Sequence, residues 1–514
     1  MGATDVPDDE QRAMIGAFSP LGPLGDMSPD ELRAHLHRLA DWVADYRGGI
    51  GERSIAPRVQ PGEVAARTTD ILPENAEPTA KILDDLDAIV LPGVLHWGHP
   101  AFLGYFGSTT NGPALLGEIA AAALNVSAMT WKTSPAATEI EGVVLHWIQD
   151  LIGLDRGYFG VVYDTASIAI LHALAAARER ASSAVRERGL AGRAELPAMR
   201  VYASDQAHSS VAKAMVVLGL GEANLVRIAS DTAYCMEVAA LDAAIRRDVA
   251  QGLKPMAVVA TIGTTSTASV DPVAEIAAVC AAYGVWLHVD AAYGGAIGVL
   301  PEGRAMLAGV ERADSVVVNP HKWLFVPLDF SALYVRDREA LRAVFALTPE
   351  YLEGDAAPAH ASGAANEYAV NYMDYGIQLG RRFRALKAWM VFRAFGRAGI
   401  ESRVREHCRL ASLFARWVSE TPGFELAAPQ RMGIICFRFA PATMLPNAMD
   451  QVNADIVERV NAAGDAYLTW TRLRGGVCMR VGLGNVLTTE AHLRHVWLRV
   501  VDESARPSDA ARAP

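Results

Sequence analysis

The chain has 514 residues, of which 51% are hydrophobic and 20% are charged, and its formal net charge is -11. This length and composition predict a globular protein with a large core and two or three domains. The negative charge argues against nucleic acid or an anionic membrane as the main partner, because both are bound through clustered Lys and Arg side chains.

Residues 1–110 are predicted to form a helical segment without a core of its own. Ser28-Pro29-Asp30-Glu31 has the N-cap Ser, the N1 Pro and the N3 Glu of a helix start, so an amphipathic helix is expected over residues 29–46. A Pro-rich stretch then leads to an apolar helix over residues 80–90. Such a segment is expected to pack on another body, and a second subunit is the expected partner.

The most apolar helix pattern, over residues 114–129, is too short to cross a bilayer, which needs about 20 apolar residues. It is expected to be a buried helix. The five cysteines form no C-x-x-C pair and show no metal-type spacing, and the N-terminal residues have no basic and apolar leader. We therefore expect no bound metal and a reducing, cytoplasmic setting.

Short β-branched strands alternate with helix-length segments from about residue 111. The predicted strands cover residues 160–163, 199–203, 257–260, 285–289 and 315–318. This alternation predicts an α/β domain over residues 111–386, with a mainly parallel sheet covered by helices on both faces. Residues 387–514 show a long helix, strands over 433–439, a helix over 450–462 and a strand over 477–481, which predicts a smaller α+β domain.

Polar residues follow each predicted strand, at the edge where parallel sheets bind ligands. The residues concerned are Thr165, Ala166, Ser167, His208, Thr265, Asp290, Asn319, His321 and Lys322. Taken singly, each has a structural explanation. Thr165 and Ser167 fit a helix N-cap, His208 a structural histidine and Thr265 a hydroxyl-rich loop. Asp290 fits a salt-bridged carboxylate, and Lys322 fits a solvated lysine. Their coincidence at five strand ends favours one shared site.

These groups match the requirements of pyridoxal 5'-phosphate (PLP). The cofactor takes a Lys amine for its Schiff base, a carboxylate at its pyridine nitrogen, a flat group against its ring and donors for its phosphate. Lys322 and Asp290 offer the amine and the carboxylate, and His208 offers a flat ring. Free N–H groups and hydroxyls at a helix N-terminus suit the phosphate. The sequence therefore predicts a PLP-dependent enzyme.

Four segments resemble the group II PLP-dependent decarboxylases, specifically the aromatic-L-amino-acid decarboxylases. They are residues 134–139 (Ser-Pro-Ala-Ala-Thr-Glu), 204–210, 288–293 and 319–323 (Asn-Pro-His-Lys-Trp). The resemblance implies a type I, aspartate-aminotransferase-like PLP fold and a homodimer with active sites at the subunit interface. It also implies decarboxylation of an aromatic amino acid to the arylalkylamine and CO2.

The resemblance assigns roles residue by residue. Lys322 is implied as the Schiff-base lysine, Asp290 as the partner of the pyridine nitrogen and His208 as the ring stacked on the cofactor. The other residues implied to hold the cofactor are Thr165, Ala166, Ser167, Thr265, Asn319 and His321. The residues implied near the substrate are Trp97, Tyr105, Phe106, Ser108 and Gly380. Arg480 is expected to form a structural ion pair, because gripping the substrate carboxylate would stabilise the ground state.

Residues 347–371 are rich in Ala, Gly and Ser and are predicted to form a lid. By resemblance, Tyr351 in this lid protonates the α-carbon after CO2 leaves. Related aldehyde synthases commonly carry Phe there, so Tyr351 favours simple decarboxylation. Gly380 leaves room for an indole, which makes tryptophan the first choice of substrate, ahead of phenylalanine, tyrosine and DOPA.

Three alternatives stay open: an aldehyde synthase, an aminotransferase and a non-catalytic PLP-binding protein. The last rests on Asp164 and Ile168, which stand where relatives usually have Gly and Glu around the phosphate turn.

Overall fold

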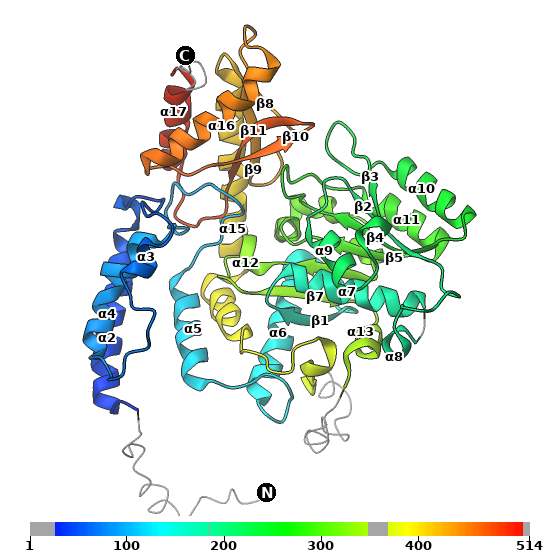
Figure 1. The fold of residues 1–514 in the computed structure, drawn as a ribbon, viewed down its shortest axis with the longest axis horizontal. Helices are drawn as coiled ribbons and strands as arrows, with labels where there is room; N and C mark the ends of the chain where they lie inside the picture. The colour runs from blue at the N-terminus through cyan, green and yellow to red at the C-terminus, as the bar shows by residue number, and fades with distance from the viewer. Residues whose placement is uncertain (1–25, 183, 348–367, 507–514) are drawn as a thin grey trace, which may run out of the picture. The chain divides into compact units, whose positions relative to one another are not determined.

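The computed structural model describes residues 26–182, 184–347 and 368–506, and the chain divides into two compact units, Met1–His96 and Trp97–Pro514 (Figure 1). In the first unit, helix α2 (Pro29–Gly48) begins with the predicted capping box. The Ser28 hydroxyl accepts from the Glu31 N–H at 3.2 Å, and the Glu31 carboxylate accepts from the Ser28 N–H at 2.8 Å.

Little of the first unit is buried. Its other α-helices are α3 (Glu63–Ala66) and α4 (Thr79–Asp85), and a π-helical turn, Leu86–Val90, continues α4. Among its described residues only Ile50, Ile55 and His96 are buried. Within the unit, the Trp42 indole donates to the Asp87 carboxylate at 3.1 Å and links α2 to that turn.

The second unit contains a seven-stranded sheet. In spatial order its strands are β1 (Phe159–Tyr163), β7 (Ser331–Val335), β6 (Ser315–Val318), β5 (Trp286–Asp290), β4 (Lys254–Thr261), β2 (Met199–Ser204) and β3 (Leu225–Ile228). The neighbours from β6 to β3 are parallel, whereas β7 is antiparallel to both β1 and β6. The predicted mainly parallel α/β fold is therefore confirmed.

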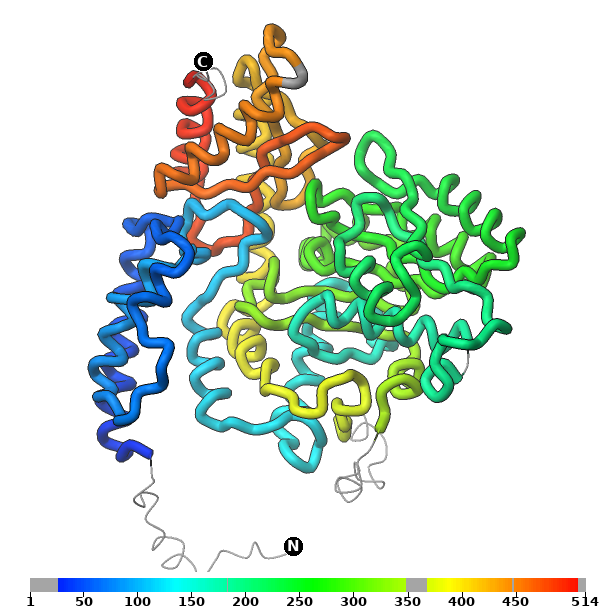
Figure 2. The backbone as a smooth tube through the Cα atoms, in the orientation of Figure 1, coloured from blue at the N-terminus to red at the C-terminus, as the bar shows by residue number. Residues whose placement is uncertain are grey.

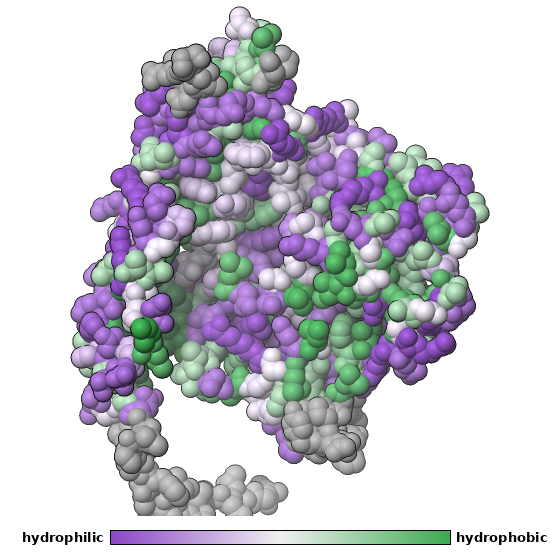
Figure 3. Space-filling model, in the orientation of Figure 1, coloured by the Kyte–Doolittle hydropathy of each residue, from purple (hydrophilic) through white to green (hydrophobic). Residues whose placement is uncertain are grey.

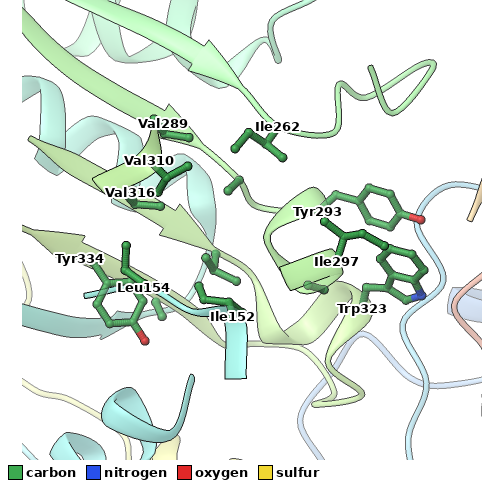
Figure 4. Packing of buried hydrophobic residues seen from close by; sticks show 14 of the residues in the cluster. Ile152, Leu154, Ile262, Val289, Tyr293, Ile297, Val310, Val316, Trp323 and Tyr334 are labelled. Atoms are coloured by element: carbon green, nitrogen blue, oxygen red, sulfur yellow. The ribbon is translucent and has the colours of Figure 1, made fainter. Parts of the chain in front are cut away.

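Helices cover both faces of this sheet, because successive strand residues point to opposite sides. Val161 packs in one core cluster with α7 (Ala166–Ala181), and Val162 packs in the other with α6 (Pro135–Ile152). The cluster on the α7 side also contains α9 (Ser210–Val217) and α13 (Arg338–Phe345) residues. The cluster on the α6 side contains residues of α10 (Val238–Ala250) and α11 (Val273–Tyr283). Figure 4 shows the packing around Val289 and Val316 in this second cluster.

The C-terminal part of the unit is built on a long helix and a four-stranded antiparallel sheet, which the tube in Figure 2 follows from yellow to red. Its elements are α15 (Ala385–Glu420), β8 (Phe424–Leu426), β9 (Ile434–Phe439), α16 (Pro446–Ala463), β10 (Thr469–Leu473), β11 (Gly476–Gly482) and α17 (Glu490–Ser504), with the strand order β10-β11-β9-β8. The domain boundary predicted at residue 386 falls inside α15 and stays a prediction. Gly396 (φ 62°, ψ 172°) interrupts this helix, in a backbone region that essentially only Gly adopts.

Several elements differ from the sequence prediction. Strands β3, β7, β8 and β10 and helix α17 were not predicted. The four strands have only 4, 5, 3 and 5 residues, and such short runs carry little periodic signal. Most of the predicted lid, residues 348–367, lies outside the described residues. No helix in the described ranges is both long and apolar enough to cross a membrane.

The helix expected over residues 114–129 is shorter and less buried than predicted. It is α5 (Gly112–Leu124), and Asn125 ends it in the left-handed conformation with φ 45°. Gly117 allows the α15 backbone to approach, since a Cβ there would lie 2.6 Å from Lys387 Cα. The opposite face leaves Leu116 and Ile119 more than half exposed, so a fully buried helix was the wrong expectation.

Candidate active site

A cavity of about 180 Å³ lies where β4, β5 and β6 end and helix α7 begins. The lining residues are Phe106, Thr165, Ala166, Ser167, His208, Thr261, Gly263, Thr265, Asp290, Ala292, Tyr293, Asn319, His321 and Lys322. Every residue predicted to hold the cofactor is among them. Thr261, Gly263, Ala292 and Tyr293 were missed, although each lies within a strand-end segment that the sequence had singled out.

Lys322 lies in the one-turn helix α12 (Pro320–Trp323), which follows the buried strand β6. Its Nζ lies 4.6 Å from the centre of the Phe106 ring and makes no hydrogen bond or ion pair with any described residue. Burial lowers the pKa of the Lys322 amine, and the Arg480 charge lowers it further, while Asp290 opposes the shift. A lowered pKa increases the neutral fraction of the amine, which is the form that attacks a carbonyl carbon.

Asp290 ends β5 and is only 6% exposed. Its Oδ1 accepts from the Ala292 N–H at 3.1 Å. The parallel register pairs Asp290 with Val317, so the end of β5 lies beside the end of β6, just before Lys322. Residues 32 positions apart in sequence thus share one cavity because neighbouring parallel strands end at the same edge.

The N-terminus of α7 is open to an anion. Thr165 is its N-cap, but the Thr165 side chain makes no capping hydrogen bond to the first turn. The Asp164 carboxylate instead accepts from the Thr165 N–H at 2.6 Å and from its hydroxyl at 3.3 Å. The acid that departs from the family pattern therefore faces its own turn. It leaves the N–H groups of Ala166 and Ser167 for a ligand.

The donor set fits the phosphate and ring of PLP. Besides the α7 N–H groups, the cavity wall carries hydroxyls of Ser167, Thr165 and Thr265. The Thr261 hydroxyl is buried and has no hydrogen-bond partner among the described residues. An unpaired buried hydroxyl costs free energy, so this donor also suits a bound polar group.

His321 and Asn319 hold the turn that presents Lys322. The Phe330 N–H donates to His321 Nδ1 at 3.0 Å, and the Asn319 amide lies 3.2 Å from His321 Nε2. The Ser331 hydroxyl donates to Asn319 Oδ1 at 2.7 Å. Burial lowers the pKa of His321 to about 3, so the ring is neutral near pH 7. Both of its nitrogens contact the protein, which favours a role in fixing the turn.

His208 lines the cavity and is exposed to solvent. The Ser210 N–H donates to its Nδ1 at 3.2 Å, and the Ser210 hydroxyl lies 2.8 Å from the same nitrogen. Desolvation lowers the pKa of His208, while the Asp290 carboxylate opposes this shift. The ring is thereby oriented by one nitrogen and leaves a flat face for the cavity.

One wall of the cavity is aromatic. The Phe106 and Tyr293 rings lie 4.5 Å apart, and Tyr293 stacks on Trp323 at 5.0 Å (Figure 4). The guanidinium of Arg480, a buried residue, lies 4.7 Å from the Phe106 ring centre. The wall therefore offers a flat, polarisable surface beside the Lys322 amine.

Arg480 forms no ion pair with any described residue, contrary to the sequence prediction. Its Nε donates to the Ser266 carbonyl at 3.1 Å and its Nη1 donates to the Tyr105 carbonyl. Backbone carbonyls replace the expected carboxylate because Arg480, on β11, contacts Ser266 in the loop after β4. It joins this loop to the segment that carries Phe106.

The other residues predicted near the substrate lie outside the lining of this cavity. Trp97 and Tyr105 stack on each other at 5.4 Å, and Gly380 is exposed. Ser108 does not line the cavity either. Their contact with substrate stays a prediction, as does that of Tyr351, which lies outside the described residues.

Comparisons with known proteins agree on one family. Residues 61–440 match the model of the pyridoxal-dependent decarboxylase conserved domain. The chain is 36% identical to phenylacetaldehyde synthase of Arabidopsis thaliana over 490 residues, which cover 94% of this chain and 97% of that protein. It is 35% identical to tryptophan decarboxylase 2 of Oryza sativa subsp. japonica over 491 residues, 94% and 96% of the two chains.

Solved structures are similar over nearly the whole chain. The crystal structure of Oryza sativa TDC with PLP and tryptamine has a TM-score of 0.87 at 35% identity and covers 94% of this chain and 99% of that one. Rhodiola rosea 4-hydroxyphenylacetaldehyde synthase has a TM-score of 0.84 at 32% identity, with 93% and 98% covered.

Proposed function

The chain belongs to the pyridoxal-dependent decarboxylase family, and we propose that it converts an aromatic L-amino acid, tryptophan first, to the arylalkylamine and CO2. PLP is the cofactor, and the enzyme is a carboxy-lyase of the group that contains aromatic amino acid decarboxylases and aldehyde synthases. The observation that carries the proposal is the single cavity that joins Lys322, Asp290 and the open α7 N-terminus beside an aromatic wall.

Bound PLP supplies an electron sink for the bond that breaks at the substrate α-carbon. Lys322 would hold the cofactor through its amine and exchange with the amine of the substrate. Asp290 would keep the pyridine nitrogen protonated, because a carboxylate in a desolvated site favours a neighbouring positive charge. The N–H groups of Ala166 and Ser167 would hold the phosphate, and His208 would cover one face of the ring.

The composition of the cavity supports an aromatic substrate over an acidic one. Lys322 is the only Lys or Arg among the lining residues, so a side-chain carboxylate such as that of glutamate would lack a cationic partner. Phe106 and Tyr293 offer a surface on which an aromatic ring stacks. Tryptophan comes first because Gly380, where relatives contact the substrate ring, adds no side chain.

An aldehyde synthase is the second candidate, and the similarity to phenylacetaldehyde synthase favours it. We propose that Tyr351 separates the two chemistries by protonating the α-carbon before oxygen reacts there. Replacing Tyr351 with Phe should divert turnover from amine towards aldehyde and hydrogen peroxide. Amine as the sole product of Tyr351→Phe would contradict the proton-donor role.

We also propose a homodimer with active sites at the subunit interface. Helix α5 supports such an interface, because it exposes three large apolar side chains while its buried positions are the small residues Ala114, Gly117 and Ala121. The exposed side chains are those of Leu116, Ile119 and Leu124. Figure 3 shows hydrophobic residues interspersed among hydrophilic ones on the visible face of the described chain.

The five free cysteines support a reducing, cytoplasmic location. Light scattering of the purified protein measures the oligomeric state.

The deciding experiment offers tryptophan, phenylalanine, tyrosine, DOPA, histidine and glutamate separately to the purified enzyme. CO2, amine, aldehyde and peroxide are measured for each. We expect CO2 and amine in equal amounts from an aromatic substrate, with tryptophan fastest. Borohydride reduction should attach PLP at Lys322, as read from the peptide mass. No CO2 from any aromatic amino acid, or PLP attached elsewhere, would overturn the proposal.

A further inference from the structure

A buried histidine outside the cavity contacts the turn that presents Lys322. His407 lies in α15, is 3% exposed and is not a lining residue of the cofactor cavity. The Trp323 indole donates to His407 Nδ1 at 3.0 Å, and His407 Nε2 lies 3.1 Å from the Asn485 carbonyl oxygen. Trp323 directly follows Lys322 in the one-turn helix α12. His407 is therefore one hydrogen bond away from this turn.

The two partners of His407 fix the tautomer of its ring. An indole N–H only donates and a carbonyl oxygen only accepts, so Nδ1 carries no proton and Nε2 carries one. Burial lowers the pKa of His407 to about 4, so the ring keeps this neutral form near pH 7. The ring thus offers the Trp323 indole one acceptor in one fixed direction.

The Trp323 indole supports the aromatic wall beside Lys322. It is fully buried and stacks on Tyr293 with an angle of 14° between the rings. Tyr293 contacts Phe106, and the Phe106 ring centre lies 4.6 Å from Lys322 Nζ. Among the described residues, His407 is the only hydrogen-bond acceptor of the indole. A rotation of Trp323 would therefore move both the wall and the backbone next to Lys322.

The other side of the His407 ring is connected to the segment that carries Phe106. The Asn485 amide donates to the Gly98 carbonyl at 3.0 Å and to the His99 carbonyl at 2.9 Å. Asn485 is 1% exposed, so these hydrogen bonds are shielded from water. The chain continues from Gly98 and His99 to Phe106, which lines the cavity. Both segments that contribute to the wall are thus held from the same ring.

We propose that His407 is a positioning residue, which fixes Trp323 through its Nδ1 acceptor and so holds Lys322 in the direction that binds PLP and exchanges with substrate. Without this acceptor, the buried indole N–H is unsatisfied, which costs free energy. The indole then turns towards another acceptor, and the Lys322 turn moves with it until PLP binding pulls it back. The cost of one such donor corresponds to about tenfold weaker PLP binding. The same displacement lowers kcat, because the reacting groups must be held in the right geometry.

The test compares three purified variants with the wild type. His407→Phe keeps a ring and removes the acceptor, so PLP affinity, followed by fluorescence, should weaken about tenfold. At saturating PLP its kcat should also fall about tenfold, while KM changes less than about twofold. Trp323→Phe removes the donor of the same hydrogen bond and should give the same losses. His407→Asn places an amide oxygen where Nδ1 stands, so its PLP affinity should stay within about threefold of the wild type.

The double variant Trp323→Phe/His407→Phe separates positioning from a general loss of packing. If His407 acts through Trp323, the double variant should bind PLP no more weakly than Trp323→Phe alone. Additive losses in the double variant, or equal losses in His407→Phe and His407→Asn, would overturn the proposal. So would variants that are less stable in urea but bind PLP as tightly as the wild type, since they would show a structural role alone.

Two further outcomes are covered by the same set of variants. If His407→Phe does not fold, Trp323→Phe tests the hydrogen bond from its other end, and unchanged PLP affinity there would overturn the proposal. The kcat comparison rests on the proposed function, whereas the PLP comparison rests on the cofactor alone. A wild type that binds PLP but releases no CO2 from aromatic amino acids would count against the function, and PLP affinity would still decide this inference.

Discussion

His172 should make the folded protein sensitive to mild acid. It lies in α7, 1% exposed, with its ring 4.6 Å from that of Tyr163 and 4.5 Å from that of Phe345. Neither ring nitrogen has a hydrogen-bond partner among the described residues. Burial lowers the pKa of His172 from 6.5 to about 4.

The sign of the effect follows from that direction. Above pH 6.5 neither the folded nor the unfolded chain protonates this ring, so its full contribution to stability is present. As the pH falls from 6.5 towards 4, this histidine becomes protonated in the unfolded chain but stays neutral in the folded chain. The free energy of unfolding therefore decreases. At pH 5.0 the two pKa values correspond to a loss of about 2 kcal/mol.

Replacing His172 with Phe keeps an aromatic ring in place and removes the proton site. Free energies of unfolding in urea, followed by tryptophan fluorescence, are compared at pH 7.5 and pH 5.0. The loss between these pH values should be smaller in His172→Phe by about 2 kcal/mol. His37→Phe, at an exposed position, should lose as much as the wild type. An undiminished loss in His172→Phe would refute the reasoning.

Three further substitutions probe the site and its support. Asp290→Asn should bind PLP but lower kcat on the order of 10²-fold, measured by CO2 release, because a neutral amide no longer holds the pyridine nitrogen protonated. Ser167→Ala should weaken PLP binding about tenfold in a fluorescence titration, and an unchanged Kd would remove Ser167 from the phosphate site. Arg381→Met should destabilise the fold by about 3–5 kcal/mol in urea, since it leaves the buried Glu141 carboxylate, 2.6 Å away, without its cation. A loss below about 1 kcal/mol would show that this pair is solvated.

Much of the cavity was predictable because most of its polar lining residues directly follow strands. Lys322 and Asp290 come at the ends of short apolar runs, which are typical of buried strands. Parallel strands end at the same edge of a sheet, so the two residues were expected to lie close together. Tyr293 was missed because its role depends on stacking with Trp323 and Phe106, which come from separate segments. No local pattern reports such a contact.

Arg480 and Asp164 show the opposite case, in which the residue was noticed but its partner was not. The expected ion pair of Arg480 is replaced by hydrogen bonds to two backbone carbonyls. The carboxylate of Asp164 turns back on Thr165. Both outcomes depend on the directions of loops, which sequence patterns leave open.

The sequence by itself determined the class of the fold, the cofactor and the strand-end residues that the structure brings into one cavity, because buried strands and the polar groups at their ends are local features. Only the tertiary structure decided that β7 runs antiparallel between β1 and β6, that α5 is half exposed, and that the Cys436 thiol donates to the Ser266 carbonyl in the loop after β4. These three features depend on strand register and on the packing of segments that are distant in sequence. Such contacts form only when the whole chain folds.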